Sequence, residues 1–425
     1  MPHFDLDYRL TEQVLANGLR VIINHDPQAP AEAVNLWYRV GSADERPGAT
    51  GFAHLFEHLM FSGSRQVAAS EHLSCLEGIG GSANATTSFD RTNFFETVPP
   101  GALELSLWLE ADRLESLALT DETFTTQREV VKEEKRQHYD NVPYGDQMEL
   151  LLALNFPENH PYAHPPIGSM ADLDAATVED ARDFFHRWYR PDNAILVTSG
   201  PIAPDEVLSM AERQLGQVKA KAWEGLRATT ALGPHRGEPS TTVVRDVPST
   251  VVNLCWRTPP LGEPAHLGVE QALLILATGQ SSRLVDLLER RQESAEAVGA
   301  GDFGFASGVS MATITARLRS GHSADEVTET VLAELTRLGE QGPTDAELAR
   351  ANAGFDREWL GRLAAVDARA DEINSFAALL GDPGLVNTWL TRVHEVTAED
   401  VARAAVEWLA PRQRATLVYQ AQETA

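Results

Sequence analysis

Cysteine is nearly absent from this sequence of 425 residues, which contains only Cys75 and Cys255. Two cysteines so far apart exclude a disulfide-rich scaffold and are typical of a reducing compartment, so we expect a cytoplasmic protein. Long apolar runs are absent too, since none approaches the roughly 18 residues of a membrane-spanning helix. The first residues lack a basic stretch followed by an apolar one, so we also expect no secretion signal.

Positive charge is scarce. The 35 Lys and Arg residues are outnumbered by 62 Asp and Glu residues, which gives a formal net charge of -27. This excess disfavours nucleic acids and anionic membranes as partners. It would suit basic ligands if the acids line a binding surface; otherwise it only keeps the protein in solution. The chain length predicts two or more domains, since a domain usually holds about 100–200 residues.

The second half of the chain repeats the first. Residues 34–39 read VNLWYR and residues 252–257 read VNLCWR, an offset of 218. Residues 177–191 and 397–411 share Thr, Glu, Asp, Trp and Pro at the same places, with an offset of 220. Two matches in the same order and at nearly one offset predict a duplicated domain.

Each copy holds strand-like and helix-like runs without strict alternation, so we predict two similar α+β domains. Their expected bounds are 1–220 and 240–425. The segment 218–242 is the expected linker, because it lacks sustained periodicity and carries Gly, Pro, Ser and Thr. Thr177 and Thr397 are followed by acids, as expected for caps that begin helices.

The stretch GFAHLFEHLMFSG, residues 51–63, places two histidines and a glutamate in an otherwise apolar, helix-like run. Histidines four residues apart lie on one face of a helix, so His54 and His58 can bind one ion. Two imidazoles suit zinc. Glu57 lies near the same face and is the expected general base, which takes a proton from water. The alternative is three side chains with structural roles only.

The repeat favours the chemical interpretation of this stretch. At an offset of 218, its three polar residues correspond to Ala272, Ile275 and Leu276, in the apolar run QALLILATG. The second copy therefore builds the matching helix from aliphatic residues. Core packing does not require two imidazoles and a carboxylate at these positions, so a metal site explains them better.

A catalytic zinc commonly has three protein ligands, and residues 119–140 read as a helix, capped by Thr120, that offers the third. Glu134 is the carboxylate on its inward stripe, with Glu129 and Glu133 to either side, so we choose Glu134 as the ligand. The alternative is a solvated acid on a charge-rich helix. The expected stripe, at spacings of three and four, consists of Phe124, Gln127, Val131, Glu134 and His138.

These residues resemble the M16 metallopeptidases, the inverzincin group. That family is marked by H-x-x-E-H followed about 75 residues later by a zinc-ligand Glu, and here 75 residues lie between His58 and Glu134. The resemblance covers essentially the whole chain. It implies one zinc per chain, with His54, His58 and Glu134 as ligands. It also implies that Glu57 is the catalytic base of an endopeptidase, and that each of two similar domains packs helices against a mainly antiparallel sheet.

The resemblance also assigns supporting residues. Asn84, Ala85 and Thr86 would lie on an edge strand that pairs with an extended substrate through backbone hydrogen bonds. Many family members carry a second Glu seven residues before the ligand Glu. Here that position is Gln127, whose side chain can still hydrogen-bond but carries no charge, so we expect it to support the metal shell more weakly than a Glu would.

The second half departs from the pattern of active family members. Those carry an Arg and, seven residues later, a Tyr, which stabilise the oxyanion. Here Arg290 is present and position 297 is Ala. We therefore expect the catalytic half of a heterodimer, whose partner is a paralogue that supplies an Arg and Tyr pair. The alternatives are an active homodimer and a non-catalytic structural or docking subunit. The expected substrates are unfolded peptides or leader peptides.

Overall fold

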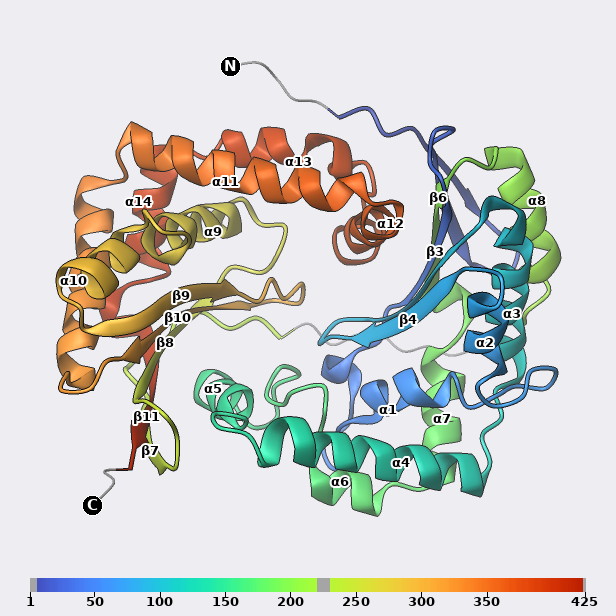
Figure 1. Cartoon of the computed structure of the whole chain (residues 1–425), viewed down its shortest axis with the longest axis horizontal. Helices are drawn as coiled ribbons and strands as arrows, with labels where there is room; N and C mark the ends of the chain where they lie inside the picture. Colours follow the sequence, from blue (N-terminus) through green and yellow to red (C-terminus); the bar gives the residue numbers. More distant parts are fainter. Residues whose placement is uncertain (1–5, 220–229, 423–425) are drawn as a thin grey trace. The chain divides into compact units, whose positions relative to one another are not determined.

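The computed structural model describes residues 6–219 and 230–422, which divide into two units (Figure 1). Within these two stretches, no helix is both long and apolar enough to cross a membrane. Unit 1 consists of the described residues of 1–135, 164–227 and 359–389. Unit 2 consists of the described residues of 136–163, 228–358 and 390–425.

The units differ from the predicted domains in two segments. Residues 136–163 join unit 2 although they precede the expected linker, and residues 359–389 join unit 1 although they follow it. Of that linker, 218–242, residues 220–229 lie outside the described part of the chain, and a strand already begins at Ser240.

Unit 1 is built on a six-stranded sheet in the order β1-β2-β6-β3-β5-β4. β2 and β6 are parallel, and all other neighbours are antiparallel. Every residue of β3 and β6 is buried, because α3 and α8 cover one face of the sheet and α12 covers the other (Figure 1). The strands are β1 (Leu10–Val14), β2 (Arg20–His25), β3 (Glu32–Tyr38), β4 (Ser82–Thr87), β5 (Thr92–Val98) and β6 (Ala194–Gly200).

The helices of unit 1 come from both halves of the sequence. α12 belongs to the second half and packs on β3 and β6. The helices are α1 (Phe52–Leu59), α2 (Glu71–Glu77), α3 (Leu103–Ser116), α4 (Asp121–Lys135), α6 (Met170–Ala175), α7 (Val178–Trp188), α8 (Pro204–Gln214) and α12 (Val366–Ser375).

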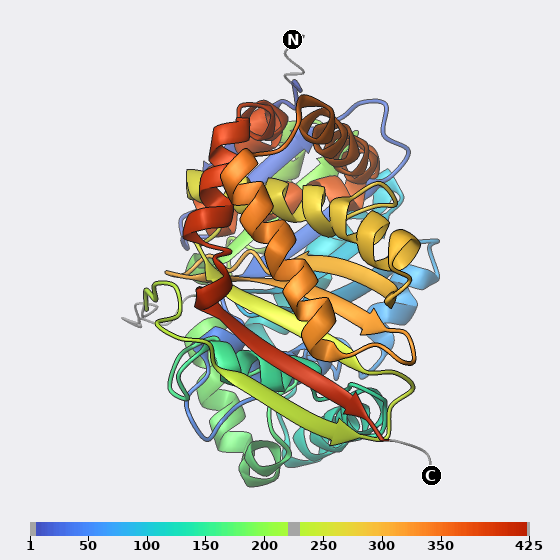
Figure 2. The same ribbon diagram turned by 90° about the vertical axis from the view of Figure 1, so that its left-hand side faces the viewer.

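Unit 2 is built on a five-stranded sheet in the order β7-β11-β8-β10-β9, and β11 lies between β7 and β8 in Figure 2. α9 and α10 pack on one face of this sheet and α5 on the other (Figure 1). The strands are β7 (Ser240–Arg245), β8 (Val251–Thr258), β9 (Ala295–Asp302), β10 (Ser310–Leu318) and β11 (Arg414–Ala421). The helices are α5 (Gln147–Asn155), α9 (Pro264–Ala277), α10 (Ala324–Gln341) and α14 (Ala398–Glu407), with α11 (Asp345–Ala364) and α13 (Leu385–His394) contributing residues to both units.

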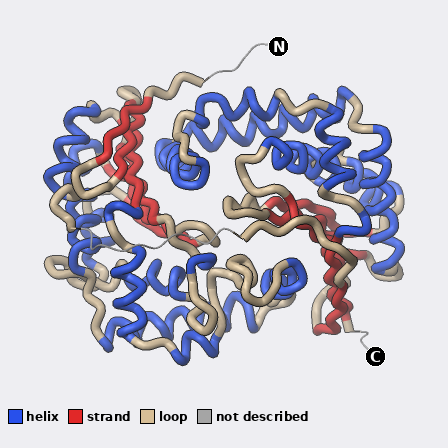
Figure 3. The backbone as a smooth tube through the Cα atoms, turned by 180° about the vertical axis from the view of Figure 1, so that it is seen from behind, coloured by secondary structure: helices blue, strands red, loops and turns tan. Residues whose placement is uncertain are grey.

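The predicted duplication of an α+β domain is confirmed by the two sheets, each of which is bordered by helices (Figure 3). The order β2-β6-β3-β5-β4 in unit 1 has the same pattern as β7-β11-β8-β10-β9 in unit 2, and the first pair is parallel in both. The predicted caps are also confirmed. The hydroxyl oxygens of Thr177 and Thr397 accept hydrogen bonds from the backbone N–H groups of Asp180 and Asp400, at the starts of α7 and α14.

One predicted helix ends differently from expectation. The hydroxyl of Thr120 accepts from the N–H of Thr123 and so caps α4, as predicted. However, the α-helix stops at Lys135 and continues as a π-helical turn over Arg136–Asp140. The wider turn changes which side chains share a face. His138 is therefore exposed, and its predicted place on the inward stripe is wrong.

Candidate metal centre and active site

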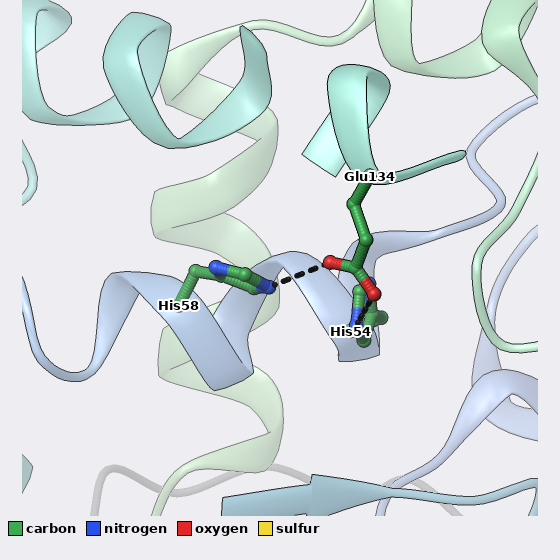
Figure 4. Close-up of side chains that lie close together, drawn as sticks. All are labelled: His54, His58 and Glu134. Atoms are coloured by element: carbon green, nitrogen blue, oxygen red, sulfur yellow. Dashed lines mark ion pairs between the residues drawn. The ribbon is translucent and has the colours of Figure 1, made fainter. Parts of the chain in front are cut away.

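Three of the predicted residues meet between α1 and α4 of unit 1. α1 begins after Gly51, and its residues His54 and His58 present their imidazoles on one side (Figure 4). Glu134 Oε1 lies 3.6 Å from His54 Nε2, and Glu134 Oε2 lies 3.3 Å from His58 Nε2. The structure thus brings together side chains that are far apart in the sequence.

This donor set fits zinc. The three ligand atoms lie within 4.8 Å of one another. Zinc at about 2.0–2.2 Å from each ligand would set neighbouring ligands about 3.3 Å apart, close to the two measured distances. Burial lowers the pKa of His54 and so favours the neutral imidazole, which is the form that binds metal. Two histidines and a glutamate also form a known ligand set of catalytic zinc.

The neighbouring acid Glu129 does not belong to this cluster. Its carboxylate lies 3.0 Å from Lys132 Nζ and 3.2 Å from an Arg128 nitrogen, on the exposed side of α4. The choice of Glu134 over Glu129 therefore agrees with the geometry of the helix.

A second group of possible metal donors in the described residues suits a cation poorly. His72, Glu96 and Glu110 are all buried, and their donor atoms lie within 4.8 Å of one another. However, Arg113 Nε donates to Glu110 Oε2 at 3.0 Å. The guanidinium already supplies the positive charge that a metal would bring.

Glu57, the predicted base, lines the same pocket as His58, one of the possible metal ligands. Thr87 Oγ1 donates a hydrogen bond of 2.6 Å to Glu57 Oε2. The pocket has a volume of about 320 Å³ and also contains the predicted residue Gln127. Its lining residues are Glu57, His58, Phe61, Ser70, Leu73, Ala83, Asn84, Ala85 and Gln127.

The predicted substrate strand is β4, which stands at the end of the sheet order and, among the described strands, pairs only with β5. Such an outer strand is where an extended peptide can add. Asn84 and Ala85 line the pocket beside Glu57. Thr86 does not line this pocket, and its hydroxyl donates to Asn93 Oδ1 at 2.5 Å.

Sequence reasoning missed Glu45, which holds the start of α1. Its buried carboxylate accepts hydrogen bonds from the N–H groups of Gly51, at 2.8 Å, and Ala53, at 2.7 Å. A carboxylate at this position satisfies helix N–H groups and complements the helix dipole. The available signal was that Gly51, which has no side chain to act as a cap, precedes the helix that carries His54 and His58.

The residues predicted for the oxyanion lie in unit 2. Arg290 Nη2 donates to Gln280 Oε1 at 2.8 Å, from the π-helical segment Val285–Arg291. Ala297 lies on the outer strand β9 and borders a pocket of about 310 Å³ that Tyr144 also lines. The Tyr144 hydroxyl donates to Ser249 O at 2.6 Å and accepts from Ser249 N at 3.1 Å. These two bonds hold the Tyr144 hydroxyl against the backbone of Ser249.

Comparison with protein families gives two matches. Residues 20–164 match the family described as "Insulinase (Peptidase family M16)", and residues 175–355 match the one described as "Peptidase M16 inactive domain". Together they span well over half of the chain. The first match contains His54, His58 and Glu134, and the second contains Arg290 and Ala297.

Individual proteins resemble the chain over nearly its whole length. A zinc protease, PqqE, of Helicobacter pylori is 26% identical over 416 residues, which is 95% of this chain and 91% of the relative. The crystal structure of a protease from Helicobacter pylori has a TM-score of 0.91 at 25% identity and covers 97% of this chain and 99% of its own. The periplasmic protease PqqL from Escherichia coli has a TM-score of 0.77 at 18% identity and covers 99% of this chain but 48% of its own.

Proposed function

The chain belongs to the M16 peptidase family, and we propose that it is a zinc-dependent endopeptidase subunit that hydrolyses unfolded peptides. One observation carries the proposal. The carboxylate of Glu57 and the imidazole of His58 line one pocket with β4, and His58 Nε2 lies 3.3 Å from a Glu134 oxygen. A general base, a metal ligand set and an edge strand are the parts that metal-assisted peptide hydrolysis requires.

His54, His58 and Glu134 would hold the zinc. When bound, zinc supplies a Lewis acid that lowers the pKa of water and stabilises negative charge on the substrate carbonyl. Gln127, in the pocket wall, would support the site by hydrogen bonding.

Glu57 would move the protons. Its carboxylate accepts one proton from the attacking water and passes a proton to the leaving nitrogen. The peptide bond then breaks to give a carboxylate and an amine. β4 would hold the extended substrate by backbone pairing, with the side chain of Asn84 as a further contact.

Replacing Glu57 tests this proposal. Glu57→Gln should keep about one zinc per chain and lose nearly all turnover, because an amide cannot accept the proton. Metal analysis and cleavage of a fluorogenic peptide library measure the two effects. Glu77→Gln, an exposed acid at the end of α2, is the matched control and should leave both unchanged. Substantial cleavage by zinc-loaded Glu57→Gln would remove Glu57 from the mechanism.

We further propose that the subunit works in a heterodimer. Its first half carries the complete zinc set, whereas its second half keeps Arg290 and has Ala297 where active family members have Tyr. Losing one oxyanion donor costs about 100- to 1000-fold in rate. A paralogue with the Arg and Tyr pair would supply what is missing. The competing functions are an active homodimer, which needs no second gene product, and a non-catalytic subunit, which would bind no zinc and cleave nothing.

The cellular role is also a proposal. Two unpaired cysteines, one exposed and one buried, favour a reducing compartment and hence the cytoplasm. Within it, the substrate would be either peptides in general or the leader of one precursor. Cell fractionation, together with comparison of peptide pools with and without the gene, distinguishes these possibilities.

A further inference from the structure

We propose that Thr87 is a positioning residue for the catalytic base, an inference that depends on the proposed peptidase function. Its hydroxyl donates to Glu57 Oε2 at 2.6 Å. This is a short, charge-assisted hydrogen bond, and such bonds are stronger than those between neutral groups. It would fix one carboxylate oxygen and leave the other directed at the water.

The position of Thr87 follows from the alternation of β4. Ala83, Ala85 and Thr87 share the face of the strand that meets α1, whereas Asn84 and Thr86 share the opposite face. Thr87 is the last residue of β4 and stands opposite Thr92 of β5. A shift of one residue in register would turn the Thr87 hydroxyl away from Glu57.

The opposite face of β4 is tied down separately. Thr86 Oγ1 donates to Asn93 Oδ1 at 2.5 Å, and Arg91 donates to the same oxygen at 3.1 Å. Asn93 Nδ2 in turn donates to Asp371 of α12 at 2.8 Å. Asp371 also accepts from Trp37 Nε1 at 2.9 Å.

This network fixes the register of β4 against β5 from one side. The fixed register holds the Thr87 hydroxyl next to Glu57 on the other side. A carboxylate on a long side chain otherwise samples several rotamers. Misplacing a reacting group by about 1 Å costs on the order of 100-fold in rate. The hydroxyl of Thr87 would therefore act on turnover, and not on zinc binding or peptide affinity.

The test compares Thr87→Val, which keeps the shape and removes the hydroxyl, with Thr87→Ser, which keeps the hydroxyl. In the subunit combination that gives wild-type turnover, Thr87→Val should lower kcat about 10- to 100-fold, with KM within about twofold and zinc content unchanged. Thr87→Ser should restore most of kcat. Crystal structures of the zinc-loaded proteins should show one Glu57 rotamer in the wild type and Thr87→Ser, and several in Thr87→Val.

Thr92→Val is the matched control, because it removes a threonine hydroxyl at the paired position, where that hydroxyl donates to Val40 O and not to Glu57. It should lower stability but preserve kcat and the single Glu57 rotamer. Wild-type kcat together with an ordered Glu57 in Thr87→Val would overturn the proposal. A wild type that cleaves nothing with any partner would refute the proposed function, and the Glu57 rotamers alone would then decide whether Thr87 orients that side chain.

Discussion

At the scale of single residues, Glu134 is distinguished from the other acids of α4 by the direction of its side chain. Its two oxygens face the imidazoles of His54 and His58, whereas Glu129 pairs with Lys132. Loss of a group that merely supports a ligand costs about 10- to 100-fold in metal affinity. Loss of a ligand should cost more.

We therefore expect Glu134→Gln to weaken zinc binding by more than about 100-fold, measured by competition with a chromogenic chelator. Glu129→Gln, on the same helix, should bind zinc like the wild type. Equal zinc affinity in the two variants would show that Glu134 is not a ligand.

The sequence predicts which of these residues lie together when they share one face of a single helix. Two histidines four apart and a stripe at three and four are properties of a helix, so the sequence alone selects His54, His58 and Glu134, which the structure then places together. It does not identify Thr87 or Glu45. The adjacent residues Thr86 and Thr87 are identical in type, and only the packing of β4 against α1 shows which of them meets Glu57.

At the scale of elements, α2, β5 and α3 share a buried polar cluster with a marked electrostatic imbalance. Burial raises the pKa of the Glu96 and Glu110 carboxyls, that of Glu110 to about 7, although Arg113 opposes the rise. Burial lowers the pKa of His72 to about 3, so His72 is neutral. One guanidinium therefore faces two carboxyls, and one retained proton makes the cluster neutral.

This imbalance predicts a pH dependence of stability. A carboxyl whose pKa is about 7 in the fold and 4.5 when unfolded stabilises the fold fully below pH 4.5, and that contribution is lost as the pH rises through about 7. Glu96→Gln imitates the protonated acid and leaves Glu110 paired with Arg113. From pH 6 to pH 8, the wild type should lose about 1–2 kcal/mol more unfolding free energy than Glu96→Gln.

Urea denaturation at each pH measures the difference, with a chelator present so that zinc binding does not contribute. His72 is common to both proteins, so its own titration cancels in the comparison. Parallel pH profiles for the two proteins would mean that the cluster retains no extra proton.

The repeated pattern of caps and strands can be predicted from the sequence, whereas the exchange of two segments between the units cannot. Thr177 and Thr397 cap the starts of helices by local hydrogen bonds. Such caps can be predicted without knowing the fold. Residues 136–163 and 359–389 each carry a helix that covers a sheet formed mainly by the other half of the sequence. An amphipathic pattern shows that a helix is covered on one face, but not by which sheet.

At the scale of the whole molecule, the proposed heterodimer follows from the difference between the two halves of the chain. The first half brings His54, His58 and Glu134 together, whereas the second half has Ala297 at the position where the proposed mechanism needs a Tyr. A chain with that defect would retain on the order of 1% or less of the turnover of a complete enzyme. Ala297 lies exposed on an outer strand, beside a pocket of about 310 Å³, so a larger side chain fits there.

Two experiments examine this dependence from opposite directions. Adding a paralogue that keeps Arg and Tyr should raise peptide cleavage by about 100-fold or more over this chain alone, and changing that paralogue's Tyr to Phe should abolish the gain.

Conversely, Ala297→Tyr should give the isolated chain measurable turnover as a self-associated enzyme, whereas Ala297→Phe, which adds the ring without the hydroxyl, should not. The Phe variant separates the effect of an oxyanion donor from that of filling the pocket. Full activity of the unmodified chain alone, unchanged by any paralogue and by either substitution, would refute the heterodimer in favour of the homodimer. The oxyanion donor would then have to come from a residue already present in this sequence.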